Sequence, residues 1–280
     1  GLCLQNTGLS CSRPSSLSFL HLTDRSTRTP LSESQWISTV NINSPDWIDS
    51  NIDHLTHGEL EITGRLVDAS NATLFGSMTH QGISVDVIYK PMAGERPLWD
   101  FPDGTLADRE YSAFLLSRLG GLNLIPPTIL REGPAGMGMV QLWIDVDESI
   151  NLSSYFSQDD PQLRKLALFD ACINNTDRKI GHLLPDSQGN LFACDHGVTF
   201  HVEDKLRTVL WQWAGDQLTS EEYEHLTQLL QVVHLHRQTF ASHLTGEEID
   251  ALMSRIQRLI DSGTMPLPSE DWPAIPWPAY

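Results

Sequence analysis

The chain carries little positive charge for its length. Its 280 residues include 18 lysines and arginines against 36 aspartates and glutamates, a formal net charge of −18 at pH 7. Nucleic-acid binding and adhesion to an anionic membrane both require clustered basic side chains. We therefore expect neither nucleic acid nor a membrane among the partners. Lysine is the scarcest charged residue, present only as Lys90, Lys165, Lys179 and Lys205.

Cysteine and long apolar runs are also scarce. The four cysteines show no CxxC spacing, and Cys172 and Cys194 lie in apolar runs typical of reduced core residues. No run of about 18 apolar residues is present, and the first residues lack the basic-then-apolar pattern of a secretory signal. These absences favour a cytoplasmic protein with no integral membrane contact. The alternative is a targeting peptide within the Ser- and Thr-rich start of the chain.

The sequence divides into three regions. Residues 1–46 lack sustained periodicity, and we expect a loosely ordered N-terminal arm there. Residues 47–144 have the pattern of a β-rich lobe, and residues 145–280 that of a helical lobe. The 16 residues from Met265 contain five prolines and two tryptophans, which predicts an extended strap packed on the helical lobe. We therefore expect an α+β fold with two lobes.

Alternating apolar and polar residues, bounded by turn residues, predict the strands of the first lobe. Helical periodicity that ends at a glycine pair predicts its helix. The expected strands are 58–67, 72–78, 83–90, 126–130 and 138–144, and the expected helix is 105–120. The first three strands should form an antiparallel meander.

Capping residues mark the helices of the second lobe. Asp160 followed by Pro161 predicts a helix start, and the expected helix runs over 161–174. A hairpin is expected over 183–194. Two capping boxes, Thr219 with Glu222 and Thr245 with Glu248, predict two late helices.

Lys90 ends a strand of β-branched and apolar residues. Burial of a lysine there costs several kcal/mol unless an anion meets it. Glu110 on the following helix is spaced to offer that carboxylate, and such a pair can orient a lysine toward phosphate oxygens. The simpler alternative is that Lys90 extends its ammonium group to solvent.

A second cluster follows the helix at 161–174. The segment from Asn174 to His182 precedes a short hairpin whose far strand ends in Asp195-His-Gly197. Because a hairpin brings its ends together, Asp177, His182 and Asp195 should converge. Two carboxylates and an imidazole can orient a hydroxyl and hold a divalent cation. The alternative is that both segments are ordinary loop and turn sequences.

This order of motifs resembles the protein-kinase-like superfamily, and within it the phosphatidylinositol 3-/4-kinase-like branch. It is most similar to a small actinobacterial group related to that branch, and the resemblance covers roughly residues 55–262. The segment Asn174–Arg178, which corresponds to the catalytic segment of the family, is the most specific part of the resemblance. The segments that carry the resemblance are Tyr89-Lys-Pro91, Gly94–Phe101, Ala107–Glu110, Pro126–Thr128 and Asn174–Arg178.

The resemblance implies a kinase-like fold and an ATP-dependent phosphotransferase that uses Mg²⁺ or Mn²⁺. Lys90 would contact the nucleotide phosphates and pair with Glu110. Asp177 would position or deprotonate the accepting hydroxyl, with Arg178 nearby, and Asp195 would be the main metal ligand. The turn Ser70-Asn71-Ala72 would cover the phosphates, and the backbone of Gln141, Leu142, Trp143 and Ile144 would meet adenine.

Three departures from the family pattern concern the metal site, the phosphate loop and the residue after Asp195. His182 stands where the family has the asparagine that serves as second metal ligand, and imidazole suits softer cations than Mg²⁺. This substitution implies a preference for Mn²⁺, a single-metal mechanism or reduced activity. The phosphate loop lacks repeated glycines, and His196 replaces the usual residue between Asp195 and Gly197.

Three functions stay open at this point. The first is an active phosphotransferase with an unidentified small-molecule or protein hydroxyl as acceptor, which Lys205 and Arg207 could help to bind if it is anionic. The second is a nucleotide-binding pseudokinase that acts as a regulatory scaffold, or an enzyme that transfers AMP. The third is a metal-dependent hydrolase built from Asp177, His182, Asp195 and His196.

The acidity of the chain favours dependence on a metal. An acidic protein that binds an anionic nucleotide needs local positive charge. The candidates are Lys90, Arg178 and a bound divalent cation.

Overall fold

A computed structural model of the protein describes residues 44–66 and 72–280. Most of the expected arm, and Ser70 and Asn71 of the expected phosphate loop, lie outside the described residues. The helices are α1 (Pro45–His57), α2 (Leu106–Leu119), α3 (Leu152–Tyr155), α4 (Pro161–Ile173), α5 (Ser220–Leu235), α6 (Arg237–Phe240) and α7 (Gly246–Ser262). The strands are β1 (Glu59–Arg65), β2 (Leu74–His80), β3 (Ile83–Pro91), β4 (Thr128–Gly133), β5 (Gly136–Leu142), β6 (Leu183–Pro185) and β7 (Leu191–Ala193).

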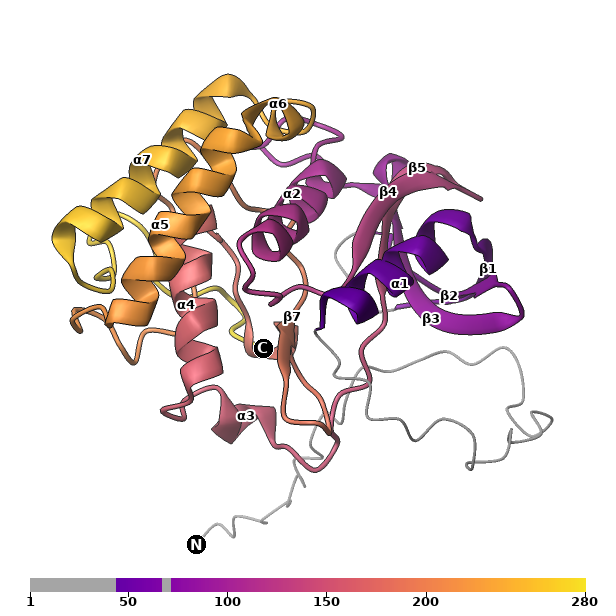
Figure 1. The fold of residues 1–280 in the computed structure, drawn as a ribbon, viewed down its shortest axis with the longest axis horizontal. Helices are drawn as coiled ribbons and strands as arrows, with labels where there is room; N and C mark the ends of the chain where they lie inside the picture. Colours follow the sequence, from indigo (N-terminus) through magenta and orange to yellow (C-terminus); the bar gives the residue numbers. More distant parts are fainter. Residues whose placement is uncertain (1–43, 67–71) are drawn as a thin grey trace, which may run out of the picture.

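The β-rich lobe is built on one antiparallel sheet with the strand order β1-β2-β3-β5-β4 (Figure 1). The predicted meander is confirmed as β1, β2 and β3, and the other two predicted strands are β4 and β5. A tight turn joins β2 to β3. Gln81 and Gly82 both have positive φ between β2 and β3, which is the geometry of a two-residue hairpin turn.

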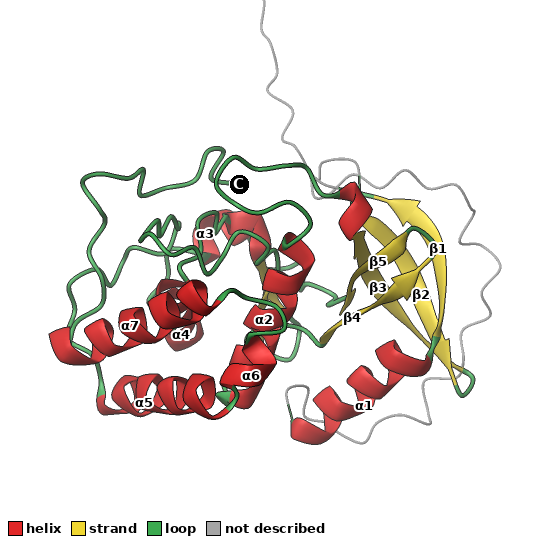
Figure 2. Ribbon diagram, turned by 90° about the horizontal axis from the view of Figure 1, so that it is seen from above, coloured by secondary structure: helices red, strands yellow, loops and turns green. Residues whose placement is uncertain are grey.

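Helix α1 lies along one face of this sheet, as Figures 1 and 2 show. It begins where the Ser44 side chain accepts a hydrogen bond from the Trp47 amide, with proline in its first turn. Leu55 is fully buried in the core that α1 shares with the sheet. The Arg131 guanidinium of β4 donates to the Leu55 carbonyl (2.8 Å) and to the Gly58 carbonyl (2.9 Å), which fixes the end of the helix.

The helical lobe packs α4, α5 and α7 around a second apolar core (Figure 1). The predicted start of α4 is confirmed, since Asp160 accepts hydrogen bonds from the Gln162 and Leu163 amides. Both predicted capping boxes are present at the starts of α5 and α7. Among the described helices, none is both long and apolar enough to cross a membrane.

Helix α2 stands between the two lobes and joins them. Its apolar residues, Phe114 and Leu116 among them, belong to the core of the helical lobe, while its other contacts include β4 and β5. Together the sheet lobe, α2 and the helical lobe confirm the expected α+β architecture with two lobes.

The Pro- and Trp-rich tail runs in extended form back toward the middle of the molecule. The Ala274 carbonyl accepts hydrogen bonds from the Thr208 amide (3.0 Å) and the Trp211 indole (2.8 Å). The Ala279 carbonyl accepts from the Ile180 amide (2.9 Å), beside β7 (Figure 1). We call residues 265–280 the strap.

Candidate active site

Lys90 joins the two lobes through its ammonium group. It lies near the end of β3, and its Nζ donates to Glu110 Oε1 at 2.7 Å and to Asp195 Oδ1 at 2.9 Å. Burial alone would lower the pKa of Lys90, but the charges of Asp195 and Glu110 hold it above its ordinary value. Lys90 in turn holds the pKa of Asp195 well below its ordinary value. Lys90 and Asp195 are therefore both ionised at neutral pH.

Glu110 connects Lys90 to the Asp195-His-Gly197 turn. Its side chain is buried on α2, and Oε2 accepts a hydrogen bond from the His196 amide at 2.7 Å. The start of α2 is held by Glu95, whose carboxylate accepts from the Leu106 and Ala107 amides (3.1 and 2.9 Å). One helix end therefore sets the position of Glu110, and Glu110 sets that of Lys90 and of the turn after β7.

The loop after α4 presents Asp177 at the surface between the lobes. Asn174 ends α4 in the left-handed conformation (φ 55°), which turns the chain out of the helix. The Asn175 side chain then accepts from the Asp177 amide at 3.0 Å and donates to Asp170 at 2.9 Å. The Asp177 carboxylate itself is left to face Lys179, whose Nζ lies 3.2 Å from it.

Burial raises the pKa of Asp177, the charges of Lys179 and Arg207 lower it, and that of Asp195 raises it, for a net increase. The Arg207 Nε is anchored on the Thr176 carbonyl at 2.7 Å. Asp177 is thus a partly buried carboxylate with two cations near it, and its raised pKa suits a group that accepts a proton.

Arg178 lies in the interior of the protein, fully buried. Its guanidinium makes a two-pronged contact with the buried Asp170 (2.8 and 3.0 Å) and donates to the Cys194 carbonyl (2.8 Å). This differs from the expectation that Arg178 offers its charge to a nucleotide, because Asp170 neutralises that charge within the core. Arg178 instead joins the loop that carries Asp177 to the strand end that carries Asp195.

His182 and Asp195 lie in contact, as the hairpin predicts. The His182 Nε2 is 3.3 Å from Asp195 Oδ2, and its Nδ1 accepts from the Lys179 amide at 3.4 Å. Since an acceptor nitrogen carries no proton, these two contacts favour the tautomer with the proton on Nε2. Burial lowers the pKa of His182 to about 4, which the neighbouring cations assist and Asp195 opposes. The ring is therefore uncharged at neutral pH.

Asp195 and His182 form a donor set that fits a divalent cation. The Asp195 side chain is 48% exposed and ionised. For the His182 Nε2 to offer its lone pair to a metal, the ring proton must move to Nδ1, and the hydrogen bond from the Lys179 amide must be given up. One carboxylate and one nitrogen suit Mn²⁺ better than Mg²⁺. Asp195 also adopts a left-handed backbone (φ 62°), a conformation that aspartate tolerates better than most residues other than glycine.

His196 does not join these ligands. It is fully buried, with Nε2 2.6 Å from the Arg178 guanidinium, and no hydrogen-bond partner is found for its Nδ1. Within residues 44–66 and 72–280, no three of Asp177, His182, Asp195 and His196 have ligand atoms that all lie within 4.8 Å of one another. This geometry gives no support to a hydrolase built on the four.

The segment expected to meet adenine, residues 141–144, makes several of its hydrogen bonds and packing contacts within the sheet lobe. The Leu142 amide donates to the Pro127 carbonyl and the Trp143 amide to the Asp86 carbonyl, each at 2.9 Å. The Gln141 side chain is buried and donates to the Thr128 hydroxyl, and Ile144 packs in the core of the sheet lobe. The adenine contact therefore stays a prediction.

Ala72 is the one residue of the expected phosphate loop that the structure describes. Its amide donates to the Gly94 carbonyl at 3.2 Å. A Cβ on Gly94 would lie 2.4 Å from the Ala72 Cβ, so this approach requires glycine at 94. Ala72, just before β2, is thus held against the segment that follows β3.

The basic pair Lys205 and Arg207 lies against the strap. The Lys205 Nζ is ion-paired with Asp100 and Glu203, each at 3.2 Å. The Trp272 ring lies under both cations, with its centroid 5.2 Å from the Lys205 Nζ and 5.7 Å from the Arg207 Cζ. Lys205 is therefore engaged by carboxylates and indole, and the role of the pair in acceptor binding stays a prediction.

Sequence reasoning missed the buried residues that hold this site together. Asp170 and Asn175 fix the loop of Asp177, and Arg109 on α2 donates to the Thr199 carbonyl and pairs with Glu248 of α7. A signal was present for Arg109, since an arginine on the apolar face of a predicted helix requires a buried partner.

No protein-family model matches the chain. In fold it is similar to the solved structure of the Golgi casein kinase, with a TM-score of 0.46 and 12% identity over 78% of this chain and 76% of that one. It is also similar to the Helicobacter pylori proinflammatory kinase CtkA, with a TM-score of 0.43 and 11% identity over 75% of this chain and 93% of that one.

A curated relative is much more similar in sequence. Protein Rv2133c of Mycobacterium tuberculosis (strain ATCC 25618 / H37Rv) is 41% identical over 262 residues, an alignment that covers 81% of this chain and 94% of that protein. The chain therefore belongs to the family of Protein Rv2133c.

Proposed function

We propose that the protein is an ATP- and divalent-metal-dependent phosphotransferase of the kinase-like type, related to the phosphatidylinositol 3-/4-kinase-like branch. The observation that carries this proposal is the position of Lys90. Its ammonium group contacts Glu110 at 2.7 Å and Asp195 at 2.9 Å, and these carboxylates come from the helix between the lobes and from the turn after β7. A lysine held this way at the junction of two lobes is suited to orient phosphate oxygens.

In this proposal each carboxylate has a separate task. Glu110 holds the ammonium of Lys90 at the junction of the lobes, while Asp195, with His182, holds a divalent cation. The cation would supply charge neutralisation on the transferred phosphoryl group. Asp177 would accept a hydrogen bond from the attacking hydroxyl and take its proton, which its raised pKa favours.

Arg178 is a positioning residue in this scheme. Its bonds to Asp170 and to the Cys194 carbonyl keep the loop of Asp177 and the turn of Asp195 in one arrangement. Phosphoryl transfer depends mainly on such positioning and on electrostatic stabilisation, because the protein makes no covalent bond to the phosphorus in it.

The direct test is nucleotide binding and transfer with matched variants. We expect ATP with Mn²⁺ or Mg²⁺ to raise the thermal midpoint of the wild-type protein. Lys90→Met should abolish this rise, and turnover should fall about 100-fold or more, since a preorganised cation at the phosphates is lost. Lys165→Met changes a lysine on the outer side of α4 and should leave both properties unchanged.

The readout also separates the alternatives. Phosphoryl transfer releases ADP, and AMP transfer releases pyrophosphate, so product analysis distinguishes them. ATP binding without either product, for any hydroxyl acceptor tried, would favour the pseudokinase. An absence of any metal-dependent ATP binding, or full turnover by Asp177→Asn, would contradict the proposal.

A further inference from the structure

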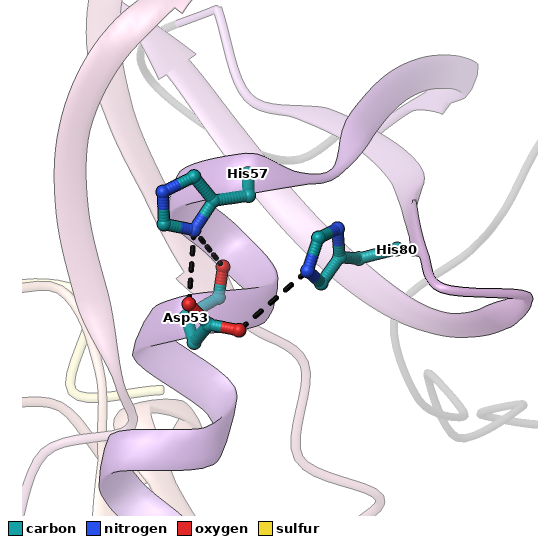
Figure 3. Close-up of side chains that lie close together, drawn as sticks. All are labelled: Asp53, His57 and His80. Carbon is teal, nitrogen blue, oxygen red and sulfur yellow. Dashed lines mark hydrogen bonds and ion pairs between the residues drawn. The ribbon is translucent and has the colours of Figure 1, made fainter.

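A second cluster of potential metal ligands lies on the β-rich lobe, away from Lys90 and Asp195. It consists of Asp53 and His57 on α1 and His80 at the end of β2 (Figure 3). Their nearest ligand atoms all lie within 4.8 Å of one another. Among the described residues, no other group of three or more histidine, cysteine or carboxylate side chains is this close.

The local structure explains why these three side chains meet. Asp53 and His57 are four residues apart on α1, which places them on one face of the helix. His80 is the last residue of β2, and the Gln81-Gly82 turn fixes its direction. His54, also on α1, donates through Nε2 to the Ile83 carbonyl at 2.9 Å and stacks edge-to-face on His80, with ring centroids 5.6 Å apart.

The distances fit a small divalent cation. A tetrahedral zinc ion with ligands at about 2.0–2.1 Å requires donor atoms about 3.3 Å apart. The His57 Nδ1 lies 2.9 Å from Asp53 Oδ1, and the His80 Nε2 lies 3.6 Å from Asp53 Oδ2 (Figure 3). These two contacts use different oxygens of Asp53, whereas a bound ion would take one of them. One ligand atom from each of the three residues already lies within 4.8 Å of the other two, so ligation requires small side-chain rotations toward that spacing.

Accessibility and chemistry point to the same class of ion. The side chains of Asp53 and His57 are more than half exposed, so an ion can enter and retain a water molecule. Two imidazole nitrogens with one carboxylate oxygen favour Zn²⁺ and other late first-row divalent cations over Mg²⁺ or Ca²⁺.

We propose that Asp53, His57 and His80 form a zinc-type metal site that pins α1 to the β2–β3 hairpin. Bound metal would join the helix to the sheet at the end of α1 opposite its Ser44 cap. This site uses none of the residues of the proposed phosphotransferase, so each proposal can fail without the other.

The experiment is a titration of the full chain with Zn²⁺ in excess Mg²⁺, which keeps hard-ion oxygen sites occupied. The wild type should bind one equivalent of Zn²⁺ more than His57→Ala/His80→Ala, and its thermal midpoint should rise by about 2 °C or more with Zn²⁺. Asp53→Asn keeps the shape of the side chain and should weaken binding by about tenfold or more.

Two controls identify the site. His225 on α5 forms a similar i, i+4 pair with Glu221 (3.9 Å) but belongs to no such group of three ligands, so His225→Ala should bind Zn²⁺ like the wild type. Asp195→Asn should also retain the equivalent that the double variant loses.

A Co²⁺ titration gives an independent signature. Visible absorption from nitrogen-ligated Co²⁺ should appear in the wild type and disappear in the double variant. Equal Zn²⁺ stoichiometry in wild type and double variant, loss of the equivalent in Asp195→Asn, or no Zn²⁺ binding at all would overturn the proposal. The cluster would then be a hydrogen-bonded surface group only.

Discussion

At the residue scale, the ion pair Arg178–Asp170 joins two loops of the candidate site. Both side chains are fully buried, and each makes further bonds: Arg178 to the Cys194 carbonyl and Asp170 to Asn175. A buried ion pair is no strong source of stability compared with apolar residues, but removal of one partner leaves an uncompensated charge. The pair therefore matters most for the geometry of the two loops that it joins.

Arg178→Met should lower the free energy of unfolding by about 3–5 kcal/mol, because Asp170 remains buried without its counter-charge. Urea denaturation measures the change. Arg258→Met removes a comparable but exposed contact with Asp204 and should cost less than about 1 kcal/mol. Similar losses in the two variants would show that Arg178 has no special position.

His182→Asn should change the metal preference rather than the fold. An amide oxygen is a harder ligand than an imidazole nitrogen, so the ratio of Mg²⁺-supported to Mn²⁺-supported ATP turnover should rise by about tenfold. Steady-state assays with each metal measure that ratio. If the ratio stays constant while both rates fall, His182 is not a ligand.

At the element scale, the start of α5 makes stability depend on pH. Burial of Glu222 raises its pKa, but the hydrogen bonds and charge of Arg164 (2.6 Å) and the hydrogen bonds of the Thr219 cap lower the pKa by more. The net result is a decrease. A carboxylate whose folded-state pKa is depressed contributes stability above its unfolded pKa of about 4.5, and this contribution is lost as pH falls through the folded value.

Glu222→Gln should therefore lower the free energy of unfolding by about 1–2 kcal/mol at neutral pH. The difference from the wild type should shrink as pH falls below about 4.5. Thermal denaturation across the acidic range measures it. Glu221→Gln, an exposed residue of the same turn, should show little effect at any pH; a constant deficit for Glu222→Gln at all pH values would contradict the argument.

The strap also stabilises the segment that it covers, around Thr208. Trp272 lies under Lys205 and Arg207, and neighbouring Ala274 accepts the Thr208 amide. Trp272→Ala should therefore increase hydrogen exchange at the Thr208 amide by about tenfold, since the bond opens more easily.

Trp277 offers a matched control, because its side chain is 92% exposed. Trp277→Ala should leave the exchange of Thr208 unchanged. An equal response to both substitutions would mean that the strap is held by its backbone alone.

Much of the fold could be predicted because each element carries a local signal. Strand alternation over 58–67 and 83–90, and the capping residues of the late helices, are visible in a few consecutive residues. Helix α1 was missed although Ser44-Pro45 is a helix start, because the Ser- and Thr-rich stretch before it suggested a continuous loose arm.

The site could be predicted only in part, for a physical reason. The contacts Lys90–Glu110 and His182–Asp195 form as expected, since strand ends and a short hairpin constrain where these residues lie, while Asp177 contacts Lys179. Asp170 was not expected, because its role depends on the contact of an α4 side chain with Arg178 in the core. No spacing in the sequence encodes such a contact.

At the scale of the whole molecule, the net charge of −18 opposes the binding of any anionic ligand. Each of the four lysines has a carboxylate within 4.0 Å. The positive charge of every lysine is therefore already balanced by a negative one. The pairs are Lys90 with Glu110 and Asp195, Lys165 with Glu221, Lys179 with Asp177, and Lys205 with Asp100 and Glu203.

Removal of divalent metal should therefore abolish ATP binding and not merely slow turnover. At an ATP concentration about 100 times the dissociation constant, binding stabilises the protein by about 2.7 kcal/mol, which is a rise of about 5 °C in thermal midpoint. Scanning calorimetry with ATP and Mn²⁺, before and after addition of EDTA, measures the loss. A rise that survives EDTA would show that the protein neutralises the phosphates by itself.

The strap also has a consequence for biosynthesis. Residues 265–280 follow every other described element in the chain, yet the Ala279 carbonyl holds the Ile180 amide three residues after Asp177. On the ribosome, the other described elements of both lobes emerge before this partner of the Asp177 loop. The loop of Asp177 therefore gains this hydrogen bond only after the strap has been synthesised and has packed beside Ile180.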